Sequence, residues 1–188
     1  MNHSYINEVI KDIQDISYQV EHDFGKISIE QLNWKPGPYQ WSIGQCLDHL
    51  MTTNRTYYPV FQNIIKGQYR PSLWQRMPVI PGILGKMIIN ASRPEYEKKS
   101  KTFSIFEPAP EPLTGRVLQD FQSHQSELID FFTQLDQIEN HARVISSPAS
   151  RWIIYSLKDC LTLLAVHEKR HLKQALTVRR SVSFPAGK

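Results

Sequence analysis

The sequence predicts an all-α fold, a four-helix bundle with a long Pro-rich crossover between its second and third helices. Four segments carry apolar residues at three- and four-residue steps, which is the period of an amphipathic helix. No series of segments shows the two-residue alternation typical of strands. Seven prolines lie between residues 68 and 112, too many for one continuous helix, so this stretch is predicted to be the crossover.

The first predicted helix runs from about Tyr5 to Phe24 and ends near Gly25. Its apolar side chains recur at helical spacing: Ile6, Val9, Ile10, Ile13, Ile16 and Val20. The connection that follows, residues 32–38, contains two prolines and a glycine and is predicted to be a turn. A helix with one apolar face needs other elements against which to bury it.

The second predicted helix begins at Ser42 and continues to about Lys66, just before Gly67. Ser42 and Gln45 have the spacing of a capping box, in which each side chain accepts a hydrogen bond from the other residue's backbone N–H. Within the crossover, a short helix is predicted at Leu84–Asn90 and is expected to lie across one end of the bundle.

The third predicted helix covers Leu113–Leu135, and residues 142–154 connect it to the fourth helix, Ser156–Arg180. The fourth helix opens with Ser156 and Asp159, which resemble a capping box with Asp in place of Glu. We expect residues 1–180 to form one domain and residues 181–188 to be a tail, because a chain of this length normally builds a single core.

The composition is that of an ordinary globular protein. Of the 188 residues, 40% are hydrophobic and 21% charged, which excludes a disordered chain. No stretch approaches the roughly 20 apolar residues that span a bilayer, and the N-terminus is polar. We therefore expect a cytoplasmic protein without a membrane partner.

The net charge of +4 does not by itself identify a partner, because Lys and Arg are scattered along the chain. A nucleic-acid interface would require a clustered basic stripe with interleaved aromatic residues, and none is found, so no nucleic-acid partner is expected. The two cysteines, Cys46 and Cys160, are too few for a disulfide framework. We expect both to be reduced and to pack in the core.

The fourth helix contains the pentapeptide His167-Glu168-Lys169-Arg170-His171. A spacing of four residues places both imidazoles on one helix face, where they can share one metal ion. That face coincides with the apolar stripe of the helix. Burying two neighbouring imidazoles is costly, and a shared ion relieves the cost by binding the neutral nitrogens. The alternative is a pair of buried histidines without a metal.

The pentapeptide also matches H-E-x-x-H, the metalloprotease motif in which Glu168 would be the general base. Residues 172–188 contain no His, Asp or Glu that could serve as the downstream ligand, and no substrate-binding edge strand precedes the motif. The sequence therefore argues against such a protease. Glu168 remains a weak candidate for a base, beside two structural alternatives: a hydrogen-bond partner of a ligand or a surface salt bridge.

A third ligand must come from another helix. The other histidines are His3, His22, His49, His124 and His141. His49 is the best placed, because it lies early in the second helix at the border of its apolar stripe. His124 is the rival, although its polar neighbours indicate a wetter helix face.

Three blocks of sequence resemble the DinB/YfiT-like superfamily of helical-bundle metalloproteins. They are LNWKP at residues 32–36, WSIGQCLDHL at 41–50 and HEKRHLKQ at 167–174. The likeness extends over residues 5–180. It implies a bundle with an up-down-down-up course that holds a divalent ion, zinc or nickel, on His49, His167 and His171. It also implies that members pair as homodimers.

Members of that superfamily include thiol-dependent transferases and isomerases as well as proteins described as metal-dependent hydrolases. The resemblance therefore implies a small-molecule substrate and a low-molecular-weight thiol cosubstrate. One departure is Ser147-Pro148, where many members carry His-Pro before the last helix.

Three protein ligands leave a coordination position open, as in catalytic metal sites. We therefore expect a metal-dependent enzyme, a thiol S-transferase or a hydrolase. A bundle that binds a metal or a small ligand without catalysis is the alternative. Tyr57 and Tyr58 are expected to pack in the core, and Trp34 and Trp41 to stabilise the turn before the second helix.

Overall fold

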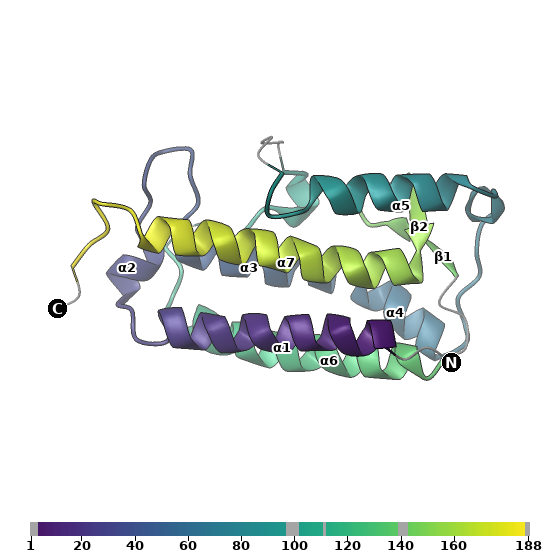
Figure 1. The fold of residues 1–188 in the computed structure, drawn as a ribbon, viewed down its shortest axis with the longest axis horizontal. Coiled ribbons are helices and arrows are strands. Elements are labelled where there is room, and N and C mark those ends of the chain that lie inside the picture. The colour runs from purple at the N-terminus through teal and green to yellow at the C-terminus, as the bar shows by residue number, and fades with distance from the viewer. Residues whose placement is uncertain (1–3, 97–101, 111, 139–142, 187–188) are drawn as a thin grey trace.

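The computed structural model describes residues 4–96, 102–110, 112–138 and 143–186. Within these ranges the chain is mostly helical, with one small two-stranded sheet (Figure 1). In chain order the elements are α1 (Ser4–Phe24), α2 (Ile29–Asn33), α3 (Ile43–Arg55), α4 (Tyr58–Ile65), η1 (Trp74–Arg76), α5 (Ile80–Ala91), η2 (Ser104–Phe106), α6 (Arg116–Asp136), β1 (Val144–Ser147), β2 (Ser150–Ser156) and α7 (Leu157–Arg179). No helix in these ranges has the length and apolar character needed to cross a membrane.

Four long elements enclose the core. α7 packs against α1 and α3, and α6 packs against the same two helices (Figure 1). Toward the α2 end the core includes Phe24, Leu47 and Phe121, and toward the hairpin end it includes Phe61 and Phe132, all nearly inaccessible to water. The prediction of a helical fold is confirmed in this coarse form.

The predicted helix starts at Ser42 and Ser156 are confirmed. The Ser42 Oγ accepts from the Gln45 N–H at 3.1 Å, and the Gln45 side chain accepts from the Ser42 N–H at 3.4 Å. At the start of α7 the Ser156 Oγ accepts from the Asp159 N–H at 3.0 Å. These bonds satisfy backbone donors that lack partners in the first turn, and they fix where α3 and α7 begin.

The prediction of one continuous helix from Ser42 to Lys66 is wrong. α3 ends at Arg55, and α4 begins at Tyr58. Pro59 explains the break, because inside a continuous helix its ring would clash with the Arg55 carbonyl and it could not donate a backbone hydrogen bond. In the first turn of α4 the missing N–H costs nothing.

A two-stranded antiparallel hairpin corrects the all-α prediction. β1 pairs with β2 within the segment that was expected to be a plain connection, residues 142–154. Ile154 and Tyr155 are buried on this hairpin, at 0% and 1% exposure. Neighbouring residues of β2 are both buried, so the strand lacks the two-residue alternation by which a strand is predicted from sequence.

Two helices outside the long elements also differ from expectation. α2 was not predicted, because five residues are too few for helical periodicity. It includes the first two residues of the predicted turn, Leu32 and Asn33, and a capping box between Ser28 and Gln31 opens it. The crossover helix α5 extends beyond the predicted Leu84–Asn90 and lies along α7 rather than across a bundle end (Figure 1). The close approach of α5 to α7 requires glycine at position 85, because a Cβ atom there would lie 2.5 Å from the Asp159 carboxylate.

Candidate metal centre

His49 projects from α3, two turns after the Ser42 cap, and is 3% exposed. Its Nδ1 lies 2.5 Å from the backbone carbonyl oxygen of Phe106. A carbonyl can only accept, so Nδ1 carries the proton and donates it. The Nε2 of His49 is therefore the nitrogen with a free lone pair, as a metal ligand requires.

His167 and His171 project from one face of α7, as the four-residue spacing predicts. The His171 Nδ1 lies 3.0 Å from the Gln174 Oε1, an acceptor that leaves the His171 Nε2 unprotonated. His171 is 9% exposed, whereas His167 is half-buried and its Nδ1 has no hydrogen-bond partner within the described residues.

The three Nε2 atoms converge on one point. The His167 Nε2 lies 3.3 Å from that of His49 and 3.1 Å from that of His171. Ligand atoms of all three residues lie within 4.8 Å of one another, close enough to hold one metal ion. Two imidazole nitrogens on a tetrahedral zinc ion at about 2.0–2.1 Å lie about 3.3 Å apart. The donor set and its spacing thus fit a divalent cation.

Burial keeps the three rings neutral. Loss of hydration lowers the pKa of His49 below its usual 6.5 and lowers that of His171 to about 3. The pKa of His167 is also lowered, first by burial and then by the neighbouring imidazoles and Arg170. With two Nδ1 protons committed to acceptors, the cluster presents lone pairs that face one another, an arrangement that a cation stabilises.

Trp41 lies against two of the histidines, His49 and His171, whereas the sequence predicted only that it packs in the turn before the second helix. Its ring centroid is 4.6 Å from that of His49 and 5.6 Å from that of His171, and it stacks on the latter. Trp34 packs instead against Phe184. An aromatic residue just before a helix cap is a weak sequence signal, so Trp41 was not identified as part of the site.

The crossover contributes the Phe106 carbonyl, which no side-chain pattern could reveal. η2 packs on α3, and the backbone N–H of Ala109 donates to the Asp48 Oδ2 at 2.6 Å. These contacts hold the segment over His49. They give part of the crossover a structural role at the site.

Glu168 lies between the two α7 ligands but faces the interior at 0% exposure, which excludes a surface salt bridge. Its carboxylate accepts from the Asn54 Nδ2 and the Gln125 Nε2, each at 2.7 Å. Burial raises its pKa to about 7, against the opposing effect of the two hydrogen bonds. The carboxylate thus bonds to amides of α3 and α6 and to none of the three histidines.

His124 is not part of the cluster, and the prediction of a wetter helix face for it is wrong. It is 1% exposed, its Nδ1 lies 3.0 Å from the Tyr58 hydroxyl, and its Nε2 lies 3.1 Å from the Asn54 Nδ2. Of the other histidines, His22 is largely exposed, and His3 and His141 lie outside the described residues.

The remaining residues singled out from the sequence lie in the core or on the hairpin. Cys46 and Cys160 are free and fully buried, as expected for packing residues. Tyr57 is buried and shares a 2.7 Å hydrogen bond with the Tyr155 hydroxyl. Ser147, at the departure from the superfamily pattern, lies in β1, near these hydroxyls.

The family profile of the DinB superfamily matches residues 19–175, most of the chain. The chain belongs to the DinB superfamily. One relative is the "Uncharacterized protein YuaE" of Bacillus subtilis (strain 168), which is 24% identical over 157 residues, covering 83% of this chain and 88% of the relative. No solved structure matches the chain.

The superfamily match includes the three histidines, all of α3 and α6 and most of α7, so the resemblance found in the sequence is confirmed at the level of the family. DinB-superfamily membership specifies neither a metal nor a reaction for this chain.

Proposed function

We propose that this DinB-superfamily protein binds one divalent ion, zinc or nickel, through His49, His167 and His171, and that it is a metal-dependent enzyme acting on a small molecule. In this proposal α1, α3, α6 and α7 form the predicted four-helix bundle, and residues 1–180 are one domain. The reaction is transfer of a low-molecular-weight thiol or, as the second class, hydrolysis.

One observation carries the proposal: three neutral imidazoles direct their Nε2 atoms at one point, and the Nδ1 partners of two of them fix that orientation. Three protein ligands are the number found in catalytic sites, where a fourth position is left for water or substrate. A divalent ion there supplies Lewis acidity, which makes a water or thiol a nucleophile near neutral pH.

The chain's own residues orient the ligands of the site. The Phe106 carbonyl and Gln174 hold the rings of His49 and His171. Trp41 packs against those two rings. Glu168 acts as a positioning group that ties α7 to α3 and α6 rather than as the base.

Elemental analysis of untagged protein is the first test. We expect about one zinc or nickel ion per chain in the wild type, loss of the ion in His49→Ala and His167→Ala, and retention in His22→Ala, which changes an exposed histidine. Absence of an ion after reconstitution with both metals would refute the metal centre.

Turnover is tested separately with the metal-loaded protein. Thiols are paired with electrophilic acceptors, and ester and amide substrates are screened alongside. Activity that disappears in His49→Ala supports the enzyme. A loaded protein that is inert to every combination, but whose melting temperature depends on the metal, supports the non-catalytic alternative instead.

A cytoplasmic location and a homodimer are further parts of the proposal. The homodimer rests on the superfamily resemblance. Cell fractionation tests the first, and light scattering of the purified chain tests the second.

A further inference from the structure

Exposed apolar side chains gather along the outer side of α5. Val79, Ile83 and Met87 follow one another at four-residue steps, with exposed fractions of 72%, 60% and 58%. Met77, just before the helix, is 43% exposed. We call these four residues the α5 face. The opposite side of α5 is already occupied, because Pro81 and Gly85 are buried where the helix packs on β2 and α7.

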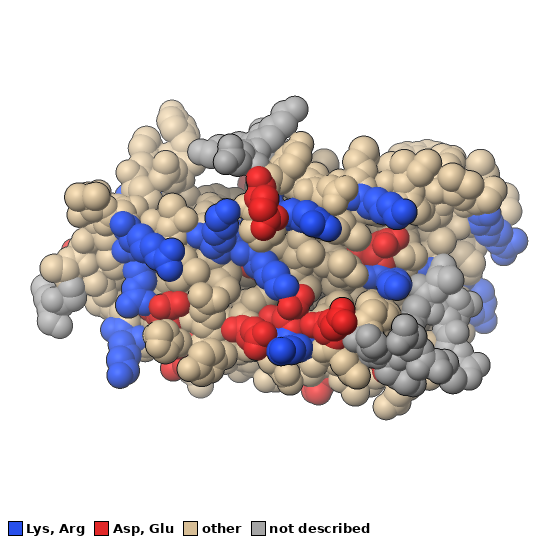
Figure 2. Space-filling model, viewed as in Figure 1, with Lys and Arg blue, Asp and Glu red and all other residues tan. Residues whose placement is uncertain are grey.

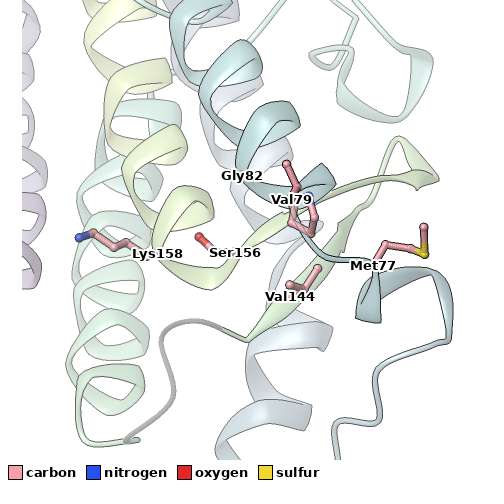
Figure 3. A pocket seen from close by; sticks show the side chains of 7 residues that line it. Met77, Val79, Gly82, Val144, Ser156 and Lys158 are labelled. Carbon is pink, nitrogen blue, oxygen red and sulfur yellow. The ribbon is translucent and has the colours of Figure 1, made fainter.

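An apolar hollow lies at the N-terminal end of the α5 face. It has a volume of about 510 Å³ and is lined by Met77, Val79, Pro81, Gly82, Val144, Ser156 and Lys158 (Figure 3). A Cβ atom at Gly82 would meet nothing within 4 Å, so the hollow is open above this glycine. None of the three clustered histidines lines it. Its size suits one or two large apolar side chains from a partner.

The segments that form this apolar area are rich in basic residues: Lys158 lines the hollow, and Lys86 lies on α5. Segments 66–95 and 143–159, which carry α5 and the hairpin, contain eight Lys and Arg residues: Lys66, Arg70, Arg76, Lys86, Arg93, Arg143, Arg151 and Lys158. Their only acids are Glu95 and Asp159. The Asp159 carboxylate accepts a hydrogen bond from the Ser156 hydroxyl. Within the described residues no carboxylate forms an ion pair with these bases.

The opposite charge lies on the other side of the molecule. α1 and α6 together carry nine Asp and Glu residues against Lys11 and Arg116. Figure 2 shows acidic side chains gathered on the lower half of the view and several basic ones above them. Two α5 faces brought together would repel each other. Among the described residues of α1 and α6, Tyr18 is the one large apolar side chain that is exposed. The acidic side of a second copy therefore lacks the apolar side chains needed to fill the hollow.

We propose that the α5 face and its hollow dock an acidic, amphipathic segment of another protein. An apolar side chain of that segment enters the hollow beside Gly82, and its carboxylates pair with bases such as Lys86. Apolar contact at the centre with charge at the rim is the usual anatomy of protein interfaces, and Met and Arg are enriched there. The proposal is independent of the metal centre, from which this surface is separate.

The test selects binders without assuming a sequence. A phage library of random peptides about twelve residues long is panned on untagged, metal-loaded protein. We expect enriched peptides to combine Asp or Glu with a Leu, Phe or Trp anchor and to bind more weakly as salt rises. Their affinity is measured by fluorescence anisotropy.

Three variants locate the binding. Gly82→Leu fills the hollow and favours the helix, Ile83→Glu places a charge on the apolar stripe, and Lys86→Glu reverses a rim charge. Each is expected to weaken binding by about tenfold or more. The matched control is Ile29→Glu, because Ile29 is 61% exposed on α2, and it is expected to bind like wild type. Circular dichroism and metal content confirm that every variant folds.

Several results would overturn the proposal. These are the absence of enrichment, enriched peptides without acidic residues, and equal binding to wild type and Gly82→Leu. Adsorption to phosphatidylserine vesicles that is lost in the same variants would assign the surface to lipid instead. A concentration-dependent dimer that is lost in Ile83→Glu would assign it to a second copy of the chain.

Discussion

Buried His124, which lies between Asn54 and Tyr58, is expected to contribute to the acid sensitivity of the fold. The side chain is 1% exposed, and the amide Nδ2 of Asn54 donates to its Nε2, which leaves its Nδ1–H to donate to the Tyr58 hydroxyl. A protonated ring could not accept from Asn54. Burial, followed by the charge of Arg55, lowers the pKa of His124 to about 3.

The size of the effect follows from this pKa. His124 has a pKa near 6.5 in the unfolded chain and near 3 in the folded chain. Its contribution to the free energy of unfolding is therefore complete above pH 6.5 and is lost as the pH falls toward 3. pH 4 lies about 2.5 units below the pKa of histidine in the unfolded chain. At this pH, proton binding by His124 therefore stabilises the unfolded state relative to the folded state by about 3 kcal/mol. For a chain of this length, a loss of about 3 kcal/mol lowers the melting temperature by about 6–12 °C.

Urea denaturation of wild type and His124→Gln measures this directly, because glutamine can form similar hydrogen bonds but does not titrate. The free energy of unfolding of wild type should fall between pH 7.5 and pH 4 by about 3 kcal/mol more than that of the variant. His22→Gln, which changes a largely exposed side chain, should leave the pH dependence of wild type unchanged. Parallel pH profiles for wild type and His124→Gln would refute the argument.

Three further substitutions test individual contacts. Gln174→Leu removes the acceptor of the His171 Nδ1–H and should weaken zinc affinity about 10–100-fold in a chelator competition assay. Asn54→Ala leaves the buried Glu168 with one donor and should lower the free energy of unfolding by about 1–3 kcal/mol in urea denaturation. Val79 has a positive φ of 69° in a tight turn closed by the Ile80 N–H and the Pro78 carbonyl; Val79→Gly should raise the melting temperature by a few degrees, about 1 kcal/mol.

The parts of the structure that the sequence predicts are those specified by neighbours along the chain. Ser42 and Ser156 mark helix starts because their partners lie three residues away. His167 and His171 share a face because a helix repeats every 3.6 residues. Pro59 breaks the second predicted helix for an equally local reason, although the apolar pattern continues past this proline.

The parts that the sequence does not predict depend on contacts between distant segments. The Phe106 carbonyl reaches His49 across 57 positions of the chain, and a backbone oxygen leaves no mark in composition. Glu168 reads as a surface residue because charge normally indicates solvent. Its burial becomes intelligible only with Asn54 and Gln125, which lie 114 and 43 positions away and supply the donors.

The metal cluster and the Glu168 network together restrict how α7 can lie against its neighbours. Apolar side chains alone tolerate small shifts of one helix along another, because many such packings have similar energy. A shift of α7 would separate His167 from His49 and, at the same time, remove Glu168 from Asn54, leaving a carboxylate buried without its partner. Because adjacent residues of α7 make these two contacts with α3, the interaction that fixes the packing of the helices also sets the spacing of the histidines.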